Sequence, residues 1–389
     1  MKDFFKLISL LFYALTYLSY RHKNVWAFGS GTGFDGNSKY LFQHINETHP
    51  SIKAFWITKR KNEVEVLRKK HLKAYYSFSL IGIYYSLIAS KYVVTGSLAD
   101  INFYTSGGAK YIQLWHGIGI KCALWSNKHS ILNNTNRIVG FIKRPSFYIQ
   151  PDFILGASEM MNKILAEMLN SDVSVVKSIL YPRCVQLRKD KSECLKYIEK
   201  WEDKSMLDFV RNLSYYKKVV LYMPTYRDKD PHFLKEQDWD IETFNENLRK
   251  TNTLLIVKLH PHMINEIDFT KCSNIVEYNR HFDIYPLMPF TDALITDYSS
   301  IYYDYILMDN KQIILYIPDK DSYISDSRDL LMDYTENCKG DIALTFEELQ
   351  NYVVSNKYNC DYYGLRQKFW GDILSTDCET LYNEIQRIK

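Results

Sequence analysis

The chain has 389 residues, of which 46% are hydrophobic and 24% are charged, and its formal net charge is +4. These values suit a globular protein of two ordinary domains with full cores, and so small a net charge gives no support for nucleic-acid binding. The seven cysteines show neither a CxxC pair nor the His/Cys spacing of a metal site, which favours reduced thiols in a cytosolic protein.

The N-terminus is almost wholly apolar and aromatic from Phe4 to Leu18. This run is short for a membrane span, and no small-residue cleavage site precedes Arg21, so we do not predict a signal peptide. We predict that residues 1–23 form an apolar membrane-associating helix, either interfacial or a short anchor, at the cytoplasmic face of the cell membrane. The alternative is a helix packed on the first domain.

From residue 24 onward, short apolar runs alternate with segments of helical periodicity. The predicted strands of the first half lie at residues 25–28, 54–57, 92–94 and 111–114, and its helices at 38–45, 63–70 and 79–89. After a charged helical stretch, further strands are predicted at 219–222, 254–257, 275–276, 293–295 and 313–316, and helices at 241–248 and 301–308. The alternation predicts two doubly wound α/β halves with a boundary near residues 171–190, and a site at the carboxyl ends of their strands.

His116 directly follows a predicted strand and precedes two glycines, Gly117 and Gly119. A tight turn there lets the substrate approach the backbone closely, and a histidine at that position can act as a general base at neutral pH. Lys121 is near enough in sequence to serve a phosphate. The alternative is a structural histidine that hydrogen-bonds the turn.

Pro224, Thr225 and Arg227 end the first strand of the second half. Thr225 and Arg227 can bind a nucleotide or phosphate, because arginine offers a fork of donors. The alternative is a loop closed by proline, with Arg227 on the surface.

Lys258 and His260 end the next strand and alternate to the same side, which suits a diphosphate leaving group. His260 and His262 could also ligate a metal. No third ligand accompanies them, so we predict no metal site here.

The stretch Thr296-Asp297-Tyr298-Ser299-Ser300 joins an apolar strand to a helix start. Free backbone N–H groups, hydroxyls and the positive end of a helix dipole predict a phosphate site. The alternative is that Ser299 or Ser300 only caps the helix. Asp304 lies one helical turn after Ser300, where it would bind a hydroxyl or orient a donor.

Residues 31–36 fit the GxGxxG pattern of dinucleotide-binding proteins. The acidic residue expected after the second strand is absent, so NAD binding is the weaker alternative. We predict instead a glycine-rich loop on the acceptor side of the site.

These four polar segments, in this order, resemble the CDP-glycerol glycerophosphotransferase family of teichoic acid and capsule synthesis. The family carries Trp-His-Gly-Thr-Pro-Leu-Lys, Pro-Thr-Tyr/Trp-Arg, basic-Leu/Met-His-Pro and Ile-Thr-Asp-Tyr-Ser-Ser followed by an aromatic-Asp pair. The matching segments here are 115–121, 224–227, 258–261 and 295–300 with Tyr303-Asp304, and the element around Asn37 also fits.

The resemblance implies a GT-B fold, with two Rossmann-like domains facing a central cleft: residues 24–180 on the acceptor side, and residues 181–389, with the C-terminal helices, binding the CDP donor. It implies transfer of polyol phosphate from a CDP-linked donor to a hydroxyl of a lipid-linked glycan or growing polymer, with CMP released. His116 and His260 would be catalytic, with His116 as the base. Donor-binding residues would be Lys258, Arg183, Pro224, Thr225, Arg227, Thr296, Asp297, Ser299, Ser300 and Asp304. Gly117, Lys121 and Asn37 would lie on the acceptor or phosphate side.

The sequence departs from the family at Ile118-Gly119, where relatives have Thr-Pro, and at Cys184-Val185 after Arg183. These changes leave the acceptor and the polyol open. The rival function is a GT-B glycosyltransferase that uses a nucleotide sugar, and a second rival is a degenerate scaffold at the membrane. We predict no bound cofactor beyond the CDP-polyol substrate. Metal dependence and homo-oligomer formation stay open.

Overall fold

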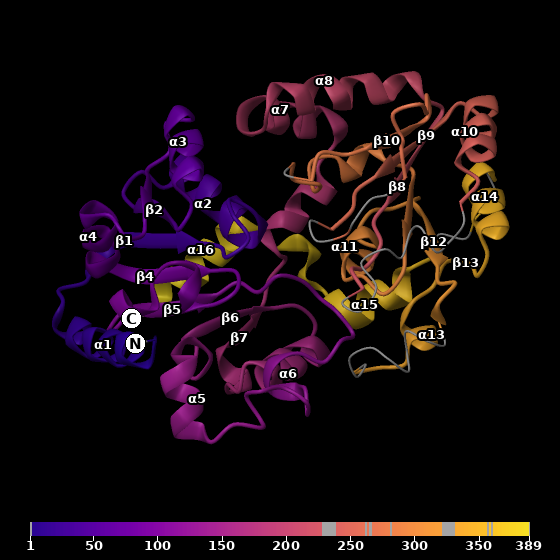
Figure 1. The fold of residues 1–389 in the computed structure, drawn as a ribbon. Coiled ribbons are helices and arrows are strands. Elements are labelled where there is room, and N and C mark those ends of the chain that lie inside the picture. The colour runs from indigo at the N-terminus through magenta and orange to yellow at the C-terminus, as the bar shows by residue number, and fades with distance from the viewer. Residues whose placement is uncertain are drawn as a thin grey trace. The chain divides into compact units, whose positions relative to one another are not determined.

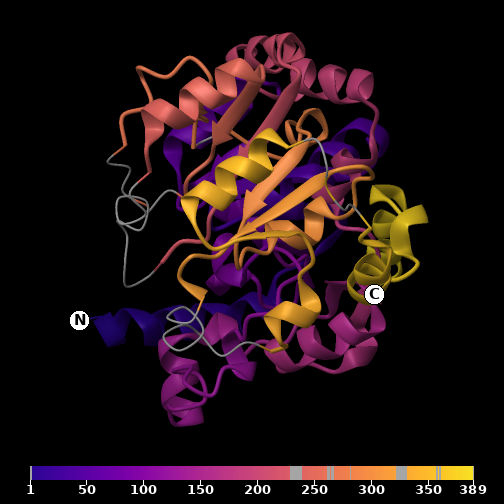
Figure 2. The same ribbon diagram turned by 90° about the vertical axis from the view of Figure 1, so that its right-hand side faces the viewer.

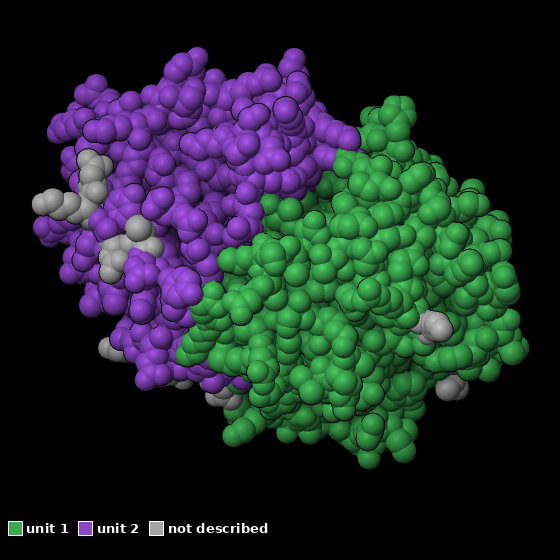
Figure 3. Space-filling view, turned by 180° about the vertical axis from the view of Figure 1, so that it is seen from behind, with its two compact units in different colours: residues 1–116, 122–185, 367–389 green, residues 117–121, 186–366 purple. Residues whose placement is uncertain are grey.

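The computed structural model describes residues 2–227, 239–260, 263, 267–280, 282–320, 331–355, 358 and 361–388. The chain forms two compact units, shown in different colours in Figure 3. Unit 1 comprises residues 1–116, 122–185 and 367–389, and unit 2 comprises residues 117–121 and 186–366. Each unit is built around its own parallel β-sheet.

The sheet of unit 1 has seven parallel strands in the order β3-β2-β1-β4-β5-β6-β7 (Figure 1). Its strands are β1 (His22–Gly29), β2 (Lys53–Thr58), β3 (Ala74–Tyr76), β4 (Ala89–Val94), β5 (Lys110–Gln113), β6 (Phe153–Gly156) and β7 (Val176–Ser178). Its helices are α1 (Lys2–Leu15), α2 (Gly36–Thr48), α3 (Lys61–Lys69), α4 (Leu80–Ile88), α5 (Arg137–Lys143), α6 (Glu159–Met168) and α16 (Cys378–Arg387).

The sheet of unit 2 has six parallel strands in the order β10-β9-β8-β11-β12-β13, which Figure 2 draws in colours from rose (β8) to golden yellow (β13). They are β8 (Lys218–Tyr222), β9 (Thr253–Val257), β10 (Ile275–Glu277), β11 (Ala293–Thr296), β12 (Gln312–Tyr316) and β13 (Asp341–Ala343). The helices of this part of the chain are α7 (Lys191–Trp201), α8 (Lys204–Asn212), α10 (Ile241–Lys250), α11 (Ile301–Tyr305), α13 (Tyr334–Asn337), α14 (Phe346–Val354) and α15 (Tyr363–Trp370), which continues into unit 1.

Alternate residues of the central strands build the core of unit 2. Val220 and Tyr222 of β8 pack with Phe244 of α10 and Leu349 of α14 in one buried cluster. Strands that are covered by helices consist of near-continuous apolar runs, which is why the sequence predicts them well. The predicted class, two parallel α/β halves of Rossmann-like topology, is confirmed. Because all strands in each sheet are parallel, the loops after them emerge at one edge of that sheet.

The N-terminal helix α1 has 14 residues, which corresponds to about 21 Å at 1.5 Å per residue. Phe12 and Tyr13 contact Tyr104 and Phe103 of unit 1 through their rings, whereas the Leu11 side chain is 62% exposed. Within the part of the chain that the structure describes, no helix has the length and apolar character needed to cross a membrane.

Candidate functional site

The turn that carries His116 has an unusual backbone. Trp115 has φ = 53° and Gly117 has φ = 140°, so left-handed conformations lie on both sides of His116. Such a conformation costs a residue with a side chain about 1–3 kcal/mol, and it persists only where neighbouring groups hold it. The turn therefore needs specific support from neighbouring groups.

Asn37 supplies part of that support from the first turn of α2. Its Nδ2 donates to the carbonyl oxygens of Leu114 and Trp115, both at 3.0 Å, and its side chain is fully buried. The start of α2 is itself fixed, because the Ser38 hydroxyl lies 2.8 Å from that of Thr95 after β4. Asn37 is thus hydrogen-bonded directly to the backbone that leads into the His116 turn.

Arg183 supplies the rest of the support. Its Nη1 donates to the His116 carbonyl oxygen at 2.7 Å, and its backbone N–H donates to Asn37 Oδ1 at 3.3 Å. The predicted residues Asn37, His116 and Arg183, which are far apart in sequence, therefore form one hydrogen-bonded network within unit 1. In this structure Arg183 contacts the histidine turn, whereas the family resemblance implied contact with the donor.

The His116 side chain can accept a proton at neutral pH. Two effects lower the pKa of His116 from its usual value of about 6.5. The larger is desolvation by the surrounding protein atoms, and the smaller is the positive charge of Arg183. Part of the side chain is exposed to solvent, which weakens both effects but leaves their direction unchanged. The imidazole is therefore mainly neutral at pH 7, in the form that a general base requires.

Replacing Asn37 with Ala is expected to impair both folding and turnover. Two carbonyl groups and the Arg183 N–H lose their partner, so the free energy of unfolding should fall by about 1–3 kcal/mol. Turnover should fall as well, because the His116 turn is released. Thermal unfolding and nucleotide release measure the two effects. Asn46→Ala on the same helix, where Nδ2 donates to Phe42 O, is the control and should change little. Wild-type turnover in Asn37→Ala would exclude this positioning role.

In unit 2, the predicted residues after β8 and β11 are bonded to one another. Arg227 Nη1 lies 2.6 Å from Asp297 Oδ2, and Arg227 Nε lies 2.9 Å from Asp319 Oδ2. The Thr225 N–H donates to Asp297 Oδ1 at 2.9 Å, and Thr296 Oγ1 donates to Met223 O at 2.8 Å. These bonds join the loops that follow three strands of the sheet, β8, β11 and β12.

Arg227 is buried rather than a surface residue, and so are Pro224 and Asp297. Burial lowers the pKa of Arg227, but the carboxylates of Asp297 and Asp319 outweigh this and raise it overall. Asp319, which sequence reasoning missed, follows β12, so the rule that polar residues gather at strand ends could have found it. The guanidinium group of Arg227 bonds Asp297 and Asp319. A contact between Arg227 and the CDP-linked donor stays a prediction.

Lys258 and His260 follow β9 in the same unit. Lys258 Nζ donates to the carbonyl oxygens of Phe282 at 3.0 Å and Arg280 at 3.3 Å, and burial lowers its pKa to about 8. The exposed His260 ring stacks on Tyr226 of the β8 loop, with 5.1 Å between the ring centroids. Pro261 and His262, which belong to the same motif, lie outside the described residues.

Ser299 and Ser300 lead into α11, which ends at Tyr305 and is shorter than predicted. Ser300 is exposed, and its side chain makes no capping hydrogen bond. Ser299 Oγ accepts only a long bond, 3.5 Å, from the Ile301 N–H. Capping therefore accounts poorly for these hydroxyls. Asp304 is fully buried and accepts a hydrogen bond from the Tyr285 hydroxyl, so its hydroxyl partner here belongs to the protein.

The segment after His116 reaches the same region of unit 2. A Cβ atom built on Gly119 would lie 3.8 Å from Ser300 Cβ, and the Ile120 carbonyl accepts a hydrogen bond from the Leu331 N–H at 2.7 Å. Gly117 is buried, and Lys121 is half-buried. Within unit 2, the predicted glycine segment and the predicted serine pair are therefore neighbours.

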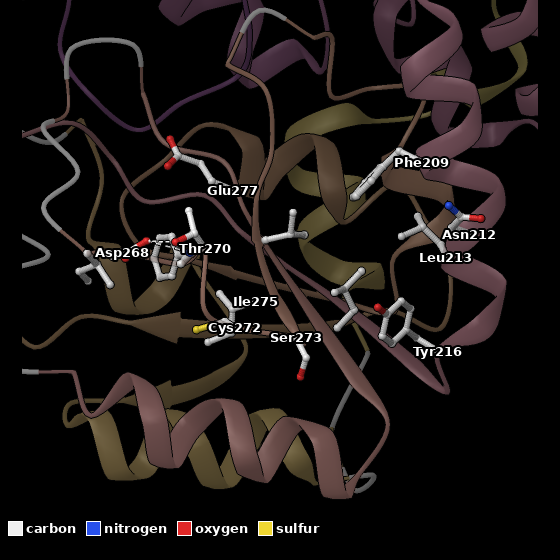
Figure 4. Close-up of a pocket in the computed structure, with 14 residues that line it drawn as sticks. Phe209, Asn212, Leu213, Tyr216, Asp268, Thr270, Cys272, Ser273, Ile275 and Glu277 are labelled. Carbon is white, nitrogen blue, oxygen red and sulfur yellow. Dashed lines mark hydrogen bonds between the residues drawn. The ribbon is translucent and has the colours of Figure 1, made fainter.

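A pocket of about 600 Å³ lies elsewhere in unit 2, along the edge strand β10 (Figure 4). Phe209 and Tyr216 line it on one side, and Cys272 and Glu277 line it on the other. None of the predicted site residues contributes to its wall. The predicted site residues therefore lie in the loops after the strands and not along this pocket.

Two parallel sheets, each with polar residues in the loops after its strands, define a two-unit Rossmann-like α/β protein. Residues 11–377 match the family model described as CDP-Glycerol:Poly(glycerophosphate) glycerophosphotransferase, so the chain belongs to this family. The resemblance found from the four motifs is thereby confirmed.

Individual relatives are distant. The teichoic acid poly(glycerol phosphate) polymerase of Bacillus subtilis strain 168 is 22% identical over 82% of this chain, and the chain spans only 42% of that polymerase. The teichoic acid glycerol-phosphate transferase of Staphylococcus aureus is 24% identical, with 83% of this chain and 81% of the relative covered. The solved wall teichoic acid polymerase TagF has the same fold, with 19% identity, a TM-score of 0.72 and coverage of 99% of this chain and 96% of that one. A histidine variant of TagF has also been solved after a soak with CDPG.

Proposed function

We propose that this protein transfers glycerol phosphate, or a related polyol phosphate, from a CDP-linked donor to a hydroxyl of a lipid-linked glycan or growing teichoic-acid-type polymer. Membership of the family and the CDPG soak of TagF support the donor class. The structural observation that carries the proposal is the exposed His116 on a strained turn held by Asn37 and Arg183, and its lowered pKa agrees with a base role.

In the proposed reaction, His116 takes the proton of the acceptor hydroxyl. The resulting oxygen attacks the β-phosphorus of the donor, a new P–O bond forms, and the bond to CMP breaks. CMP leaves with the bonding electrons, and its charge is stabilised by positively charged or hydrogen-bonding groups. Lys258, His260, Ser299 and Ser300 are the proposed holders of the donor phosphates.

This proposal assigns acceptor binding to residues 24–180 and donor binding to residues 181–389, as in a GT-B enzyme. A peripheral position at the cytoplasmic membrane face belongs to the same proposal. Its support is the exposed apolar surface of Leu11, Leu15 and Leu18 near the N-terminus.

The purified protein should release CMP from CDP-glycerol or CDP-ribitol when a teichoic-acid-type acceptor is present. UDP-sugars serve as the comparison, because the rival glycosyltransferase would attack the anomeric carbon and release UDP. Mass analysis of the product separates the two reactions: a transferred phosphate supports the proposal. UDP release together with a product that lacks phosphate would establish the rival instead.

Replacing both Ser299 and Ser300 with Ala is expected to weaken CDP-glycerol binding. Each lost hydrogen bond to a charged phosphate should cost about 1.5–3 kcal/mol, so the Kd should rise at least tenfold. Calorimetry measures the affinity. Ser205→Ala, on an exposed turn of α8 where the hydroxyl bonds Asp203, is the control; unchanged affinity in the double variant would remove the serines from the donor site.

Donor affinity is expected to fall as the pH rises through about 8. Burial lowers the pKa of Lys258 to about 8, so the ammonium group that would attract phosphate is lost above that pH. Binding titrations from pH 6.5 to 9.5 measure the effect. Lys258→Arg keeps its charge throughout and should give a flat profile over this range. An identical decline in wild type and Lys258→Arg would assign the pH dependence to another group.

A further inference from the structure

Three side chains of unit 1 that are typical metal ligands meet where α16 packs on α2. His44 lies on α2, His49 directly follows that helix, and Glu379 lies in the first turn of α16; Figure 1 shows the two helices side by side. Glu379 Oε2 lies 3.1 Å from His44 Nε2 and 2.8 Å from His49 Nε2. One ligand atom from each residue lies within 4.8 Å of the other two. Among the described residues this is the one such group found.

We propose that His44, His49 and Glu379 bind a divalent cation of the zinc type. Two imidazole nitrogens and one carboxylate oxygen are a ligand set that Zn²⁺ accepts, whereas Mg²⁺ and Ca²⁺ prefer oxygen ligands alone. A tetrahedral ion at about 2.0–2.1 Å from each ligand separates the ligand atoms by about 3.3 Å. The two His–Glu distances, 3.1 and 2.8 Å, are already close to that value.

Neighbouring side chains orient two of the three ligands. The His49 ring stacks on Tyr382 with 3.6 Å between the ring centroids, and Tyr382 packs on Trp26 of β1. Asn383 Nδ2 donates to Glu379 Oε1 at 3.3 Å, which leaves Oε2 directed at the histidines. Outer contacts of this kind fix ligand orientation in metal sites.

The site is accessible to an ion from solvent. The side chains of His44 and His49 are 23% and 18% exposed, and that of Glu379 is 44% exposed. Without metal, both Nε2 atoms contact the same carboxylate oxygen. With metal, each ring presents its Nε2 lone pair and keeps its proton on Nδ1, so the ion replaces both hydrogen bonds.

The cation would hold α16 against α2 within unit 1. Lys91 of β4 reinforces this docking, because its Nζ donates to the carbonyl oxygen of Ile388 at 2.8 Å. Helix α2 would then be held near both ends. Asn37 in its first turn bonds the His116 turn, and His44 and His49 toward its other end would bind the metal. The proposal concerns stability and does not depend on the transferase reaction.

The test uses the full chain without a polyhistidine tag, stripped of metal with EDTA. Titration with ZnCl₂ should show one site, and Mg²⁺ should not compete for it. At free zinc of 100 times the Kd, the Tm should rise by on the order of 5 °C. Glu379→Gln should weaken zinc binding at least tenfold and abolish the Tm shift.

Glu384→Gln is the matched control, because Glu384 lies on the same helix and pairs only with Arg387 among the ion pairs described there. It should bind zinc like the wild type. His44→Gln keeps the proposal testable if Glu379→Gln fails to fold, since it should show the same loss. Absence of zinc binding by the wild type, or equal binding by Glu379→Gln and Glu384→Gln, would overturn the proposal and leave a hydrogen-bonded contact between helices.

Discussion

Replacing His116 with Ala is expected to lower kcat by about 10²–10⁴-fold, the usual contribution of a general base. The affinity for CDP-glycerol should stay nearly unchanged, because the proposed donor phosphates are held by residues of unit 2. The acceptor hydroxyl would lose its proton acceptor, and water at pH 7 is a poor substitute. CMP release under saturating donor measures kcat, and calorimetry measures donor affinity.

His22→Ala is the matched control, since His22 is exposed on β1 and its ring contacts only Tyr20 among the ring contacts described for it. It should keep wild-type turnover. The pH profile adds a second readout: the pKa of His116 is lowered, so activity should persist on the acidic side of pH 6.5 and fall only as the imidazole becomes protonated. Near wild-type turnover in His116→Ala would remove this residue from the base role.

Most central strands could be predicted because burial on both faces leaves a plain sequence signal, although β6, whose apolar run is only Phe153–Leu155, was missed. Val219–Tyr222 and Leu254–Val257 are uninterrupted apolar runs, and both lie inside observed strands, β8 and β9. The edge strands β3, β7 and β13 have three residues each and are partly exposed, so they show no readable run. The predicted helix 301–308 is too long for a related reason: every residue of that stretch is buried, so no amphipathic pattern marks where the helix ends.

The positions of site residues could be predicted, but their partners could not. A polar residue at the end of a parallel strand lies at one edge of the sheet, and this placed His116, Arg227 and Asp297 correctly at strand ends. The bond from Asn37 to Trp115 joins residues 78 positions apart. Nothing in the local pattern at residue 37 distinguishes a substrate contact from support for a turn, because that difference depends on tertiary packing.

The partner of Arg227 could not be predicted from the sequence either, and the structure shows that it is the buried carboxylate of Asp297. Replacing Asp297 with Ala should lower the free energy of unfolding of unit 2 by about 3–5 kcal/mol, the usual cost of removing one partner of a buried ion pair. The Arg227 and Asp297 side chains are only 6% and 2% exposed. Asp297 also accepts the Thr225 N–H, so Ala would leave both a buried cation and a backbone donor short of a partner.

Thermal and denaturant unfolding measure this loss, with Glu246→Ala as the control. Glu246 pairs with Arg249 on α10 at 2.8 Å, but both side chains are exposed, and such pairs contribute about 0–1 kcal/mol. A large loss in Asp297→Ala with little in Glu246→Ala would establish that the pair holds the loops after β8 and β11. If Asp297→Ala kept wild-type stability and lost only CDP-glycerol affinity, the pair would not be structural, and direct donor contact would become the better assignment for Asp297. Because the loops carry Thr225 and lead to Ser299, a structural pair would still weaken donor binding, but only together with the stability loss.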